Sequence, residues 1–284
     1  MTDDSIEPAE LTADDLLVVE DDHFTAENVA IVTGGGSGIG RATAVALAAN
    51  GLTVAATDID EDGLAGTVEK AEDVGVAGTV ETVVGDLTDD DDLERIVEEA
   101  AEFGQIRYLA NIAGLQHIDP IDEFPVEQFD LLHSVMLRAP FVLSKHVIPH
   151  VEATDDGVGA IGNMASIHGH IATQDKVGYI SSKFGIRGLT KCIAAEGDGT
   201  LRSFSVSTGY VKTPLVTNQI PDTAEERGIS EREVVEDVML GDAKVTEMME
   251  PAEVANLFTL GFSKHGRHLD GGDLTWDGGH LSTY

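Results

Sequence analysis

From residue 28 onward, short apolar runs alternate with stretches of helical periodicity. Continuous apolar strands that are joined by helices favour a parallel sheet covered by helices on both faces. Ligands of such sheets bind at the carboxyl ends of the strands, near the point where the strand order reverses. We therefore predict an α/β fold, a single doubly wound sheet. The expected strands lie in the segments NVAIVTG, LTVAATD, VETVVGD, IRYLANIAG, GVGAIGNMAS, LRSFSVS and GGDLTWDGG.

Two segments fall outside this alternation. The first 22 residues carry nine acids and no base, so residues 1–23 are expected to form a solvated acidic tail, with a short amphipathic piece near Leu16–Val19. Residues 24–284 form the predicted domain. Within it, residues 210–250 are too long and too charged for a plain connection, which predicts a helical lid over a substrate.

The balance of charge restricts the possible partners. The 284 residues include 17 Lys and Arg against 52 Asp and Glu, a formal net charge of -35. A nucleic acid or an anionic membrane would be repelled, so neither is expected as a partner. Such self-repulsion is tolerable where the Debye length shrinks to about 3 Å, near 1 M salt. The charge therefore favours a protein of a salt-loving cell, the alternative being an ordinary acidic protein.

The single cysteine, Cys192, excludes an internal disulfide and fits a reducing compartment. No signal sequence opens the chain, and no apolar run is long enough to span a membrane. A cytoplasmic protein without a metal site is expected.

The segment TGGGSGIG follows the first strand and opens the first helix. Gly34 permits a tight turn, Gly38 lets the backbone approach a pyrophosphate, and Gly40 allows the helix to pack closely on the strand. Ser37 and Ile39 complete this loop. The pattern predicts a dinucleotide site, which makes the domain one of the Rossmann type.

Asp58 ends the second strand, where a carboxylate accepts hydrogen bonds from ribose hydroxyls and repels a 2′-phosphate. Ser37 is neutral, so NAD is expected rather than NADP. The alternative is that Asp58 is only a turn residue. Asp86 and Leu87 follow the third strand and would lie near an adenine, although Asp86 could equally cap the next helix.

Tyr179 and Lys183 are four residues apart in a predicted helix, so their side chains share one face. An ammonium about 5 Å from a phenol contributes roughly 3 kcal/mol at an effective dielectric near 20, which would lower a tyrosine pKa by about two units. Ser166 ends the preceding strand and would point into the same cleft. By itself such a pair is usually structural, but the glycine loop upstream and the serine make the combination specific.

Together TGGGSGIG, the NIAG that begins at Asn111, Ser166 and YISSK resemble the short-chain dehydrogenase/reductases from residue 28 to the end of the chain. The resemblance implies that Tyr179 is the acid/base, that Ser166 binds the reacting oxygen, and that Lys183 lowers the tyrosine pKa and holds the nicotinamide ribose. It also implies a homotetramer. Further cofactor contacts implied in this way are Asn111, Val211 and Thr213.

Longer segments around AGLQHIDP, ASIHGHIATQDKVGYISSK and TPLVTNQIPDT are similar to a branch of this family, the D-3-hydroxybutyrate dehydrogenases. That similarity implies a small anionic substrate whose carboxylate is bound by Gln116, His168, Lys176 and Gln219. Apart from this similarity, an anionic substrate needs a local positive charge in a protein of negative net charge, and Lys176 would supply it. Alternatively, the glutamines are ordinary loop residues, His168 caps a turn and Lys176 is solvated.

Two positions depart from the family pattern: Met136 stands where an asparagine is usual in the long helix of residues 129–150, and Thr208 replaces the proline of a Pro-Gly pair. Methionine cannot donate a hydrogen bond, so a proton relay through this position would change. Two other functions therefore stay open. One is a dehydrogenase for another small hydroxy acid or a sugar, and the other is a non-catalytic NAD-binding protein.

Overall fold

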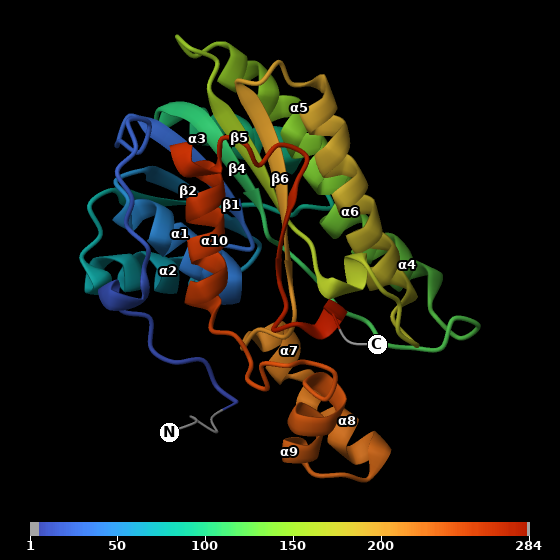
Figure 1. Ribbon diagram of the computed structural model, residues 1–284. Helices are drawn as coiled ribbons and strands as arrows, with labels where there is room; N and C mark the ends of the chain where they lie inside the picture. The colour runs from blue at the N-terminus through green and yellow to red at the C-terminus, as the bar shows by residue number, and fades with distance from the viewer. Residues whose placement is uncertain (1–5, 283–284) are drawn as a thin grey trace.

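The computed structural model describes residues 6–282, and its centre is a seven-stranded parallel sheet in the order β3-β2-β1-β4-β5-β6-β7 (Figure 1). The order reverses between β1 and β4, which lie side by side although β2 and β3 come between them in the chain. The prediction of a doubly wound α/β domain is confirmed. The strands are β1 Asn28–Thr33, β2 Thr53–Asp58, β3 Thr79–Val84, β4 Gln105–Asn111, β5 Gly159–Met164, β6 Leu201–Thr208 and β7 Asp273–Trp276.

Helices cover both faces of the sheet and enclose two hydrophobic cores. On one face lie α1 (Gly38–Ala49), α2 (Glu61–Val74) and α10 (Pro251–Phe262), and α1 packs directly on α10. On the other lie α3 (Asp90–Glu102), α5 (Ala139–Glu152) and α6 (Val177–Glu196). Strands β1 and β6 are buried along their whole length, as expected for a sheet with two covered faces.

The long helix predicted over residues 129–150 is present but not regular. It consists of α4 (Val126–His133), a π-helical segment (Ser134–Arg138) and α5. In the π-helical segment the Ala139 N–H donates to the carbonyl of Ser134, five residues earlier. Pro140 has no N–H to continue the ordinary ladder, which accounts for the change of hydrogen bonding just before it.

Residues 210–250 are largely helical, in line with the composition of the predicted lid. They contain α7 (Pro214–Thr217), α8 (Gln219–Arg227), α9 (Glu231–Glu233) and a second π-helical segment (Val234–Met239). The segment lies beyond the carboxyl ends of the strands (Figure 1). It has a small apolar core of its own, formed by Ile220, Ala224, Val234, Met239, Leu240 and Met248.

Most side chains of residues 6–23 are exposed, and the piece predicted as amphipathic, Leu16–Val19, contacts the domain. Residues 1–5 lie outside the described residues. Leu16 is buried against α1, α2 and α10. Two asparagine side chains accept backbone N–H groups of the segment: Asn256 from Leu17 at 2.7 Å, and Asn50 from Val19 at 2.8 Å. A few apolar residues and two amide side chains are sufficient to fix an otherwise acidic segment to the domain.

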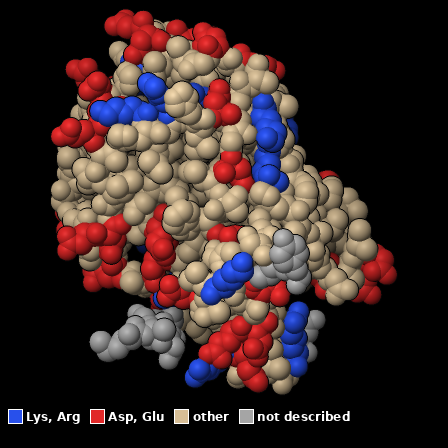
Figure 2. Space-filling view, in the orientation of Figure 1, with Lys and Arg blue, Asp and Glu red and all other residues tan. Residues whose placement is uncertain are grey.

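Acidic side chains are spread over the face of the molecule shown in Figure 2, including the region of α8 and α9. Within residues 6–282, no helix is long and apolar enough to cross a bilayer.

Candidate active site

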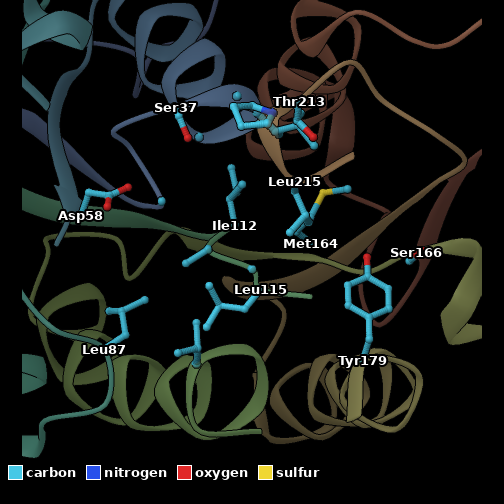
Figure 3. Close-up of a pocket in the computed structure, with 18 of the residues that line it drawn as sticks. Ser37, Asp58, Leu87, Ile112, Leu115, Met164, Ser166, Tyr179, Thr213 and Leu215 are labelled. Atoms are coloured by element: carbon cyan, nitrogen blue, oxygen red, sulfur yellow. The ribbon is translucent and has the colours of Figure 1, made fainter. Parts of the chain in front are cut away.

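A cavity of about 540 Å³ opens at the carboxyl ends of the strands, where the strand order reverses (Figure 3). Asp58 stands at one end and Tyr179 at the other, with apolar side chains between them. The sequence-predicted residues that line the cavity are Gly34, Ser37, Gly38, Ile39, Gly40, Asp58, Asp86, Leu87, Ser166, Tyr179, Lys183, Val211 and Thr213.

The glycine loop joins β1 to α1 at the floor of this cavity. Gly34 has a φ of +69°, in the left-handed region that favours glycine. A Cβ on Gly40 would lie 1.9 Å from the Gly34 carbonyl oxygen, so the first turn of α1 can approach the loop only with glycine there. This close approach leaves the N-terminus of α1 facing the cavity, which suits a pyrophosphate.

Asp58 faces the glycine loop from the end of β2. Its carboxylate accepts N–H groups of Gly36 at 3.0 Å and of Asp60 at 3.1 Å. The nearest guanidinium is used elsewhere: Arg41 donates to the Gly36 and Gly63 carbonyls and, at 3.1 Å, to Thr67 Oγ1. The residues fit the ribose end of a dinucleotide, and Arg41 donates to two backbone carbonyls and a threonine hydroxyl.

Tyr179, Lys183 and Ser166 meet at the other end of the cavity. The Tyr179 hydroxyl points into the cavity in the direction of Ser166, which follows β5 (Figure 3). Lys183 lies one turn along α6 with its Nζ 5.4 Å from the centre of the tyrosine ring. It is buried, and it donates to the Met164 carbonyl at 2.7 Å. The face shared by Tyr179 and Lys183 is the one that the four-residue spacing predicts.

The pKa values of this pair correct one sequence-based expectation. Burial raises the pKa of Tyr179 to about 12, although a hydrogen bond with Ser166 acts in the opposite direction. Burial also lowers the pKa of Lys183 to about 8. Without a bound dinucleotide the phenol is therefore less acidic than a free tyrosine, because the loss of hydration is the largest effect on it.

Two of the predicted substrate residues lie next to this group. The His168 and Tyr179 rings meet edge-on, 6.0 Å apart, and Thr173 Oγ1 lies 3.2 Å from His168 Nε2. Burial, reinforced by the Lys176 charge, lowers the pKa of His168 to about 4. Burial and then Arg227 of α8 lower the pKa of Lys176. Arg227 thus brings a second cation from the lid toward Lys176.

Three other predicted residues are engaged locally rather than lining the cavity. The Gln116 side chain accepts the N–H of His117 at 3.2 Å, and the Gln219 side chain donates to the Leu215 carbonyl within the lid. Asn111 donates to Asn163 at 2.8 Å, a buried link between β4 and β5. The Gln116 and Gln219 amides are thus bonded within their own segments, whereas the buried Asn111 Oδ1 has no hydrogen-bond partner among the described residues.

Asp86 both lines the cavity and organises its own turn, since its carboxylate accepts from the Thr88 N–H and Oγ1, each at 2.8 Å. The helix that follows is capped by Asp89 instead, which accepts from the Asp91 N–H at 2.9 Å. Thr213 contacts the glycine loop, with its Cγ2 3.1 Å from where a Cβ of Gly38 would be.

Met136 is buried within the π-helical segment and packs near Tyr179. Its thioether cannot supply the amide that the family places there, so any relay of protons from Lys183 must use other groups.

Several residues of the site were not predicted from the sequence. Apolar walls are contributed by Ile59, Ile112, Leu115, Leu131, Val135 and Met164. Ile59 is 68% exposed although it directly follows a buried strand, and an apolar residue at such a position is a usable sequence signal. Tyr210, Arg227 and His280, whose electrostatic effects reach Tyr179, Lys176 and His168, come from distant segments and carry no comparable signal.

Comparison with known proteins gives consistent results. Residues 28–224 match the short chain dehydrogenase family. The chain is 34% identical over 255 residues to D-beta-hydroxybutyrate dehydrogenase of Rhizobium meliloti, covering 88% of this chain and 97% of that protein. It is 31% identical to the 3-oxoacyl-[acyl-carrier-protein] reductase of Thermotoga maritima, covering 88% and 96%. The crystal structure of levodione reductase superimposes with a TM-score of 0.84 at 29% identity, covering 92% of this chain and all of that one. With its parallel sheet, glycine loop and Ser–Tyr–Lys group, this chain belongs to the short-chain dehydrogenase family of oxidoreductases.

Proposed function

We propose that the protein catalyses the reversible, NAD-dependent oxidation of D-3-hydroxybutyrate to acetoacetate. The observation that carries this proposal is the His168 ring 6.0 Å from the Tyr179 ring, together with two nearby cations: Lys176 acts on His168, and Arg227 acts on Lys176. In a chain with 52 acidic and 17 basic residues, two cations near this neutral imidazole suit an anionic substrate. The similarity to D-beta-hydroxybutyrate dehydrogenase of Rhizobium meliloti supports the same substrate.

The chain's own residues would handle the proton and the substrate. The glycine loop and Asp58 would hold a nicotinamide dinucleotide, which would supply the hydride acceptor and a positive charge. Tyr179 would take the proton of the 3-hydroxyl group as the carbon–hydrogen bond breaks, and Ser166 would hold the same oxygen. Lys183 would stabilise the phenolate. Tyr179 is partly buried at the cavity wall, so a positive charge close to it acts more strongly there than in bulk solvent.

The segment of residues 210–250 would act as the lid of this site. Leu215 and Val216 of α7 line the cavity, and Arg227 of α8 reaches toward Lys176. Movement of α7 and α8 as one body would close over the substrate and exclude water. Gln219 would have to exchange its bond to the Leu215 carbonyl for one to the substrate.

NAD rather than NADP is proposed as the cofactor, because Asp58 faces the ribose end of the cavity. The variant Asp58→Asn is expected to raise the KM for NAD at least about tenfold, the effect of losing a charge-assisted hydrogen bond. The same variant should tolerate NADP better, since it removes the repulsion of the 2′-phosphate. Asp60→Asn, two residues away, is the control. Unchanged KM values for both cofactors would leave Asp58 as a turn residue only.

Lys176 is proposed to bind the substrate carboxylate. Lys176→Ala should raise the KM for D-3-hydroxybutyrate by an order of magnitude or more, because it removes a charge-assisted bond of about 1.5–3 kcal/mol. The value of kcat should change much less. Lys145→Ala, an exposed lysine of α5, should leave both constants unchanged. A KM equal to that of the wild type would remove Lys176 from the substrate site.

A substrate panel tests the proposed function directly. D-3-hydroxybutyrate, other small hydroxy acids, sugars and neutral alcohols would be assayed with NAD and with NADP at high salt, following the absorbance of the reduced nicotinamide. Fast turnover of D-3-hydroxybutyrate with NAD and rejection of neutral alcohols is the expected result. Preference for another acid or a sugar would favour a different dehydrogenase. No reduction with any compound would favour a non-catalytic NAD-binding protein.

The net charge of -35 supports adaptation to high salt. Dialysis from about 1 M salt to low salt lengthens the Debye length from about 3 Å to about 30 Å, so that repulsion between surface carboxylates is no longer screened. We expect loss of the far-ultraviolet circular dichroism signal and of activity over this range. Full activity without salt would indicate an ordinary acidic protein.

A cytoplasmic homotetramer is proposed as the assembled form. Exposed phenylalanines on α5 and α6, Phe141 and Phe184, together with Trp276 of β7, support two contact surfaces. The first would join the α5 and α6 helices of two copies, and the second would join the regions of β7.

A further inference from the structure

A carboxylate at the start of β7, Asp273, lies where several elements meet behind the active site. Its Oδ1 accepts hydrogen bonds from two serines of β6, Ser205 at 2.5 Å and Ser207 at 2.9 Å. Its Oδ2 accepts from His170 Nε2 at 3.0 Å and from Thr275 Oγ1 at 3.0 Å. Ser205 and Ser207 are almost completely buried. One carboxylate therefore joins β6 and β7 to the loop that follows β5.

Helix α6 is attached to the same point through Arg187. Its Nη1 donates to the Gly169 carbonyl at 2.5 Å, and its Nε lies 3.9 Å from Asp273 Oδ2. Arg187 is one turn beyond Lys183 and two turns beyond Tyr179, so it continues their side of the helix. The loop and helix are in close contact there: a Cβ on Gly169 would lie 2.8 Å from the Lys183 carbonyl oxygen.

The loop that Asp273 and Arg187 contact, which follows β5, also carries Ser166 and His168. A short 3-10 turn covers Ile167–Gly169, and Ser166 caps it by accepting the His168 N–H at 3.1 Å. Gly169 and His170, the next residues, are the ones fixed by Arg187 and Asp273. Movement of Arg187 or Asp273 would therefore move Ser166 relative to Tyr179.

We propose that Asp273 is a positioning residue for the oxidoreductase reaction. Through His170 and Arg187 it holds the loop of residues 166–170 against α6, so that the Ser166 hydroxyl and the Tyr179 phenol reach the same substrate oxygen. The inference rests on the dehydrogenase activity of the site, and it does not depend on which hydroxy compound is the substrate.

The pair His170→Ala and His170→Gln tests this link without removing the partly buried Asp273 carboxylate. A displacement of the order of 1 Å in a catalytic group can cost about 100-fold in rate. His170→Ala is therefore expected to lower kcat about 10- to 100-fold, with the Kd for NAD unchanged by calorimetry. The side-chain amide of His170→Gln restores a donor at the position of Nε2, and it should recover kcat to within about threefold of the wild type. His150→Ala, an exposed histidine of α5, is the control.

Asp273→Asn tests the role of the Asp273 carboxylate itself. It should lower kcat as His170→Ala does, and it should speed hydrogen–deuterium exchange in residues 166–171 but not in residues 28–40. The kinetic assay uses whichever compound of the substrate panel the wild type oxidises, so failure with D-3-hydroxybutyrate would reject the proposed substrate alone. If the wild type oxidises no compound of the panel, the hydrogen–deuterium exchange of residues 166–171 alone tests the proposal. Wild-type kcat in His170→Ala, or unchanged exchange of residues 166–171 in Asp273→Asn, would overturn the proposal.

Discussion

Replacing Tyr179 with phenylalanine is expected to lower kcat by about 10³-fold, the middle of the range for loss of a general acid–base group. The ring and its packing against His168 remain, so the change removes only the hydroxyl that points into the cavity. The Kd for the dinucleotide should change little, because the glycine loop and Asp58 lie at the other end. Steady-state kinetics and calorimetry of the dinucleotide complex measure the two quantities.

Tyr108→Phe is the matched control for this experiment. Tyr108 is buried between Phe24 and Phe262, in a core away from the cavity lining. Loss of its hydroxyl should leave kcat within about twofold of the wild type, with any effect confined to stability. If Tyr179→Phe kept wild-type kcat, the proton would have to be transferred by another group, and the proposed chemistry would be rejected.

The second large effect is expected for Lys183→Met, which should lower kcat about 100-fold near neutral pH. An ammonium at 5.4 Å from the ring centre is worth roughly 3 kcal/mol at an effective dielectric near 20. Without it, the rise of kcat/KM with pH that accompanies deprotonation of Tyr179 in the dinucleotide complex should lie at higher pH than in the wild type. Lys191→Met, an exposed lysine further along the same helix, is the control.

The effect of Lys183 on kcat/KM should itself depend on pH in the wild type. Burial lowers the pKa of Lys183 to about 8, so its ammonium is present below pH 8 and lost as the pH rises through that value. The electrostatic stabilisation of the Tyr179 phenolate by Lys183 should therefore decrease above pH 8. An identical pH profile of kcat/KM in the wild type and in Lys183→Met would show that Lys183 does not act on Tyr179 electrostatically.

Much of the fold follows from local patterns. Each of the seven strands coincides with a predicted segment, and β3, β4 and β6 extend one residue beyond it. Central strands such as β1 and β5 are buried on both faces and are therefore largely apolar, whereas β3 at the sheet edge is mostly exposed. The long helix predicted over residues 129–150 is present, but its π-helical segment at Ser134–Arg138 was not predicted, since it depends on a single change of hydrogen-bond register next to Pro140.

The acidic N-terminal segment shows where charge patterns are insufficient. Nine acids predicted a solvated tail, yet residues near Leu16 pack on the domain. The partners of this segment, Asn50 and Asn256, lie about 30 and 240 residues further along the chain. The amphipathic pattern of Leu16–Val19 indicates the piece that packs on the domain, but it carries no information about which distant residues it contacts.

The sequence by itself determined the order of strands and helices, the glycine loop at the end of β1, and the common face of Tyr179 and Lys183. Each of these depends on residues a few positions apart, for which backbone geometry fixes the outcome. Only the tertiary structure decided that burial raises the Tyr179 pKa, that Gln116 and Gln219 bond within their own loops, and that Asp273 joins β6, β7, α6 and the Ser166 loop. Burial and hydrogen-bond partners are properties of residues that meet in space, and these come from distant parts of the chain.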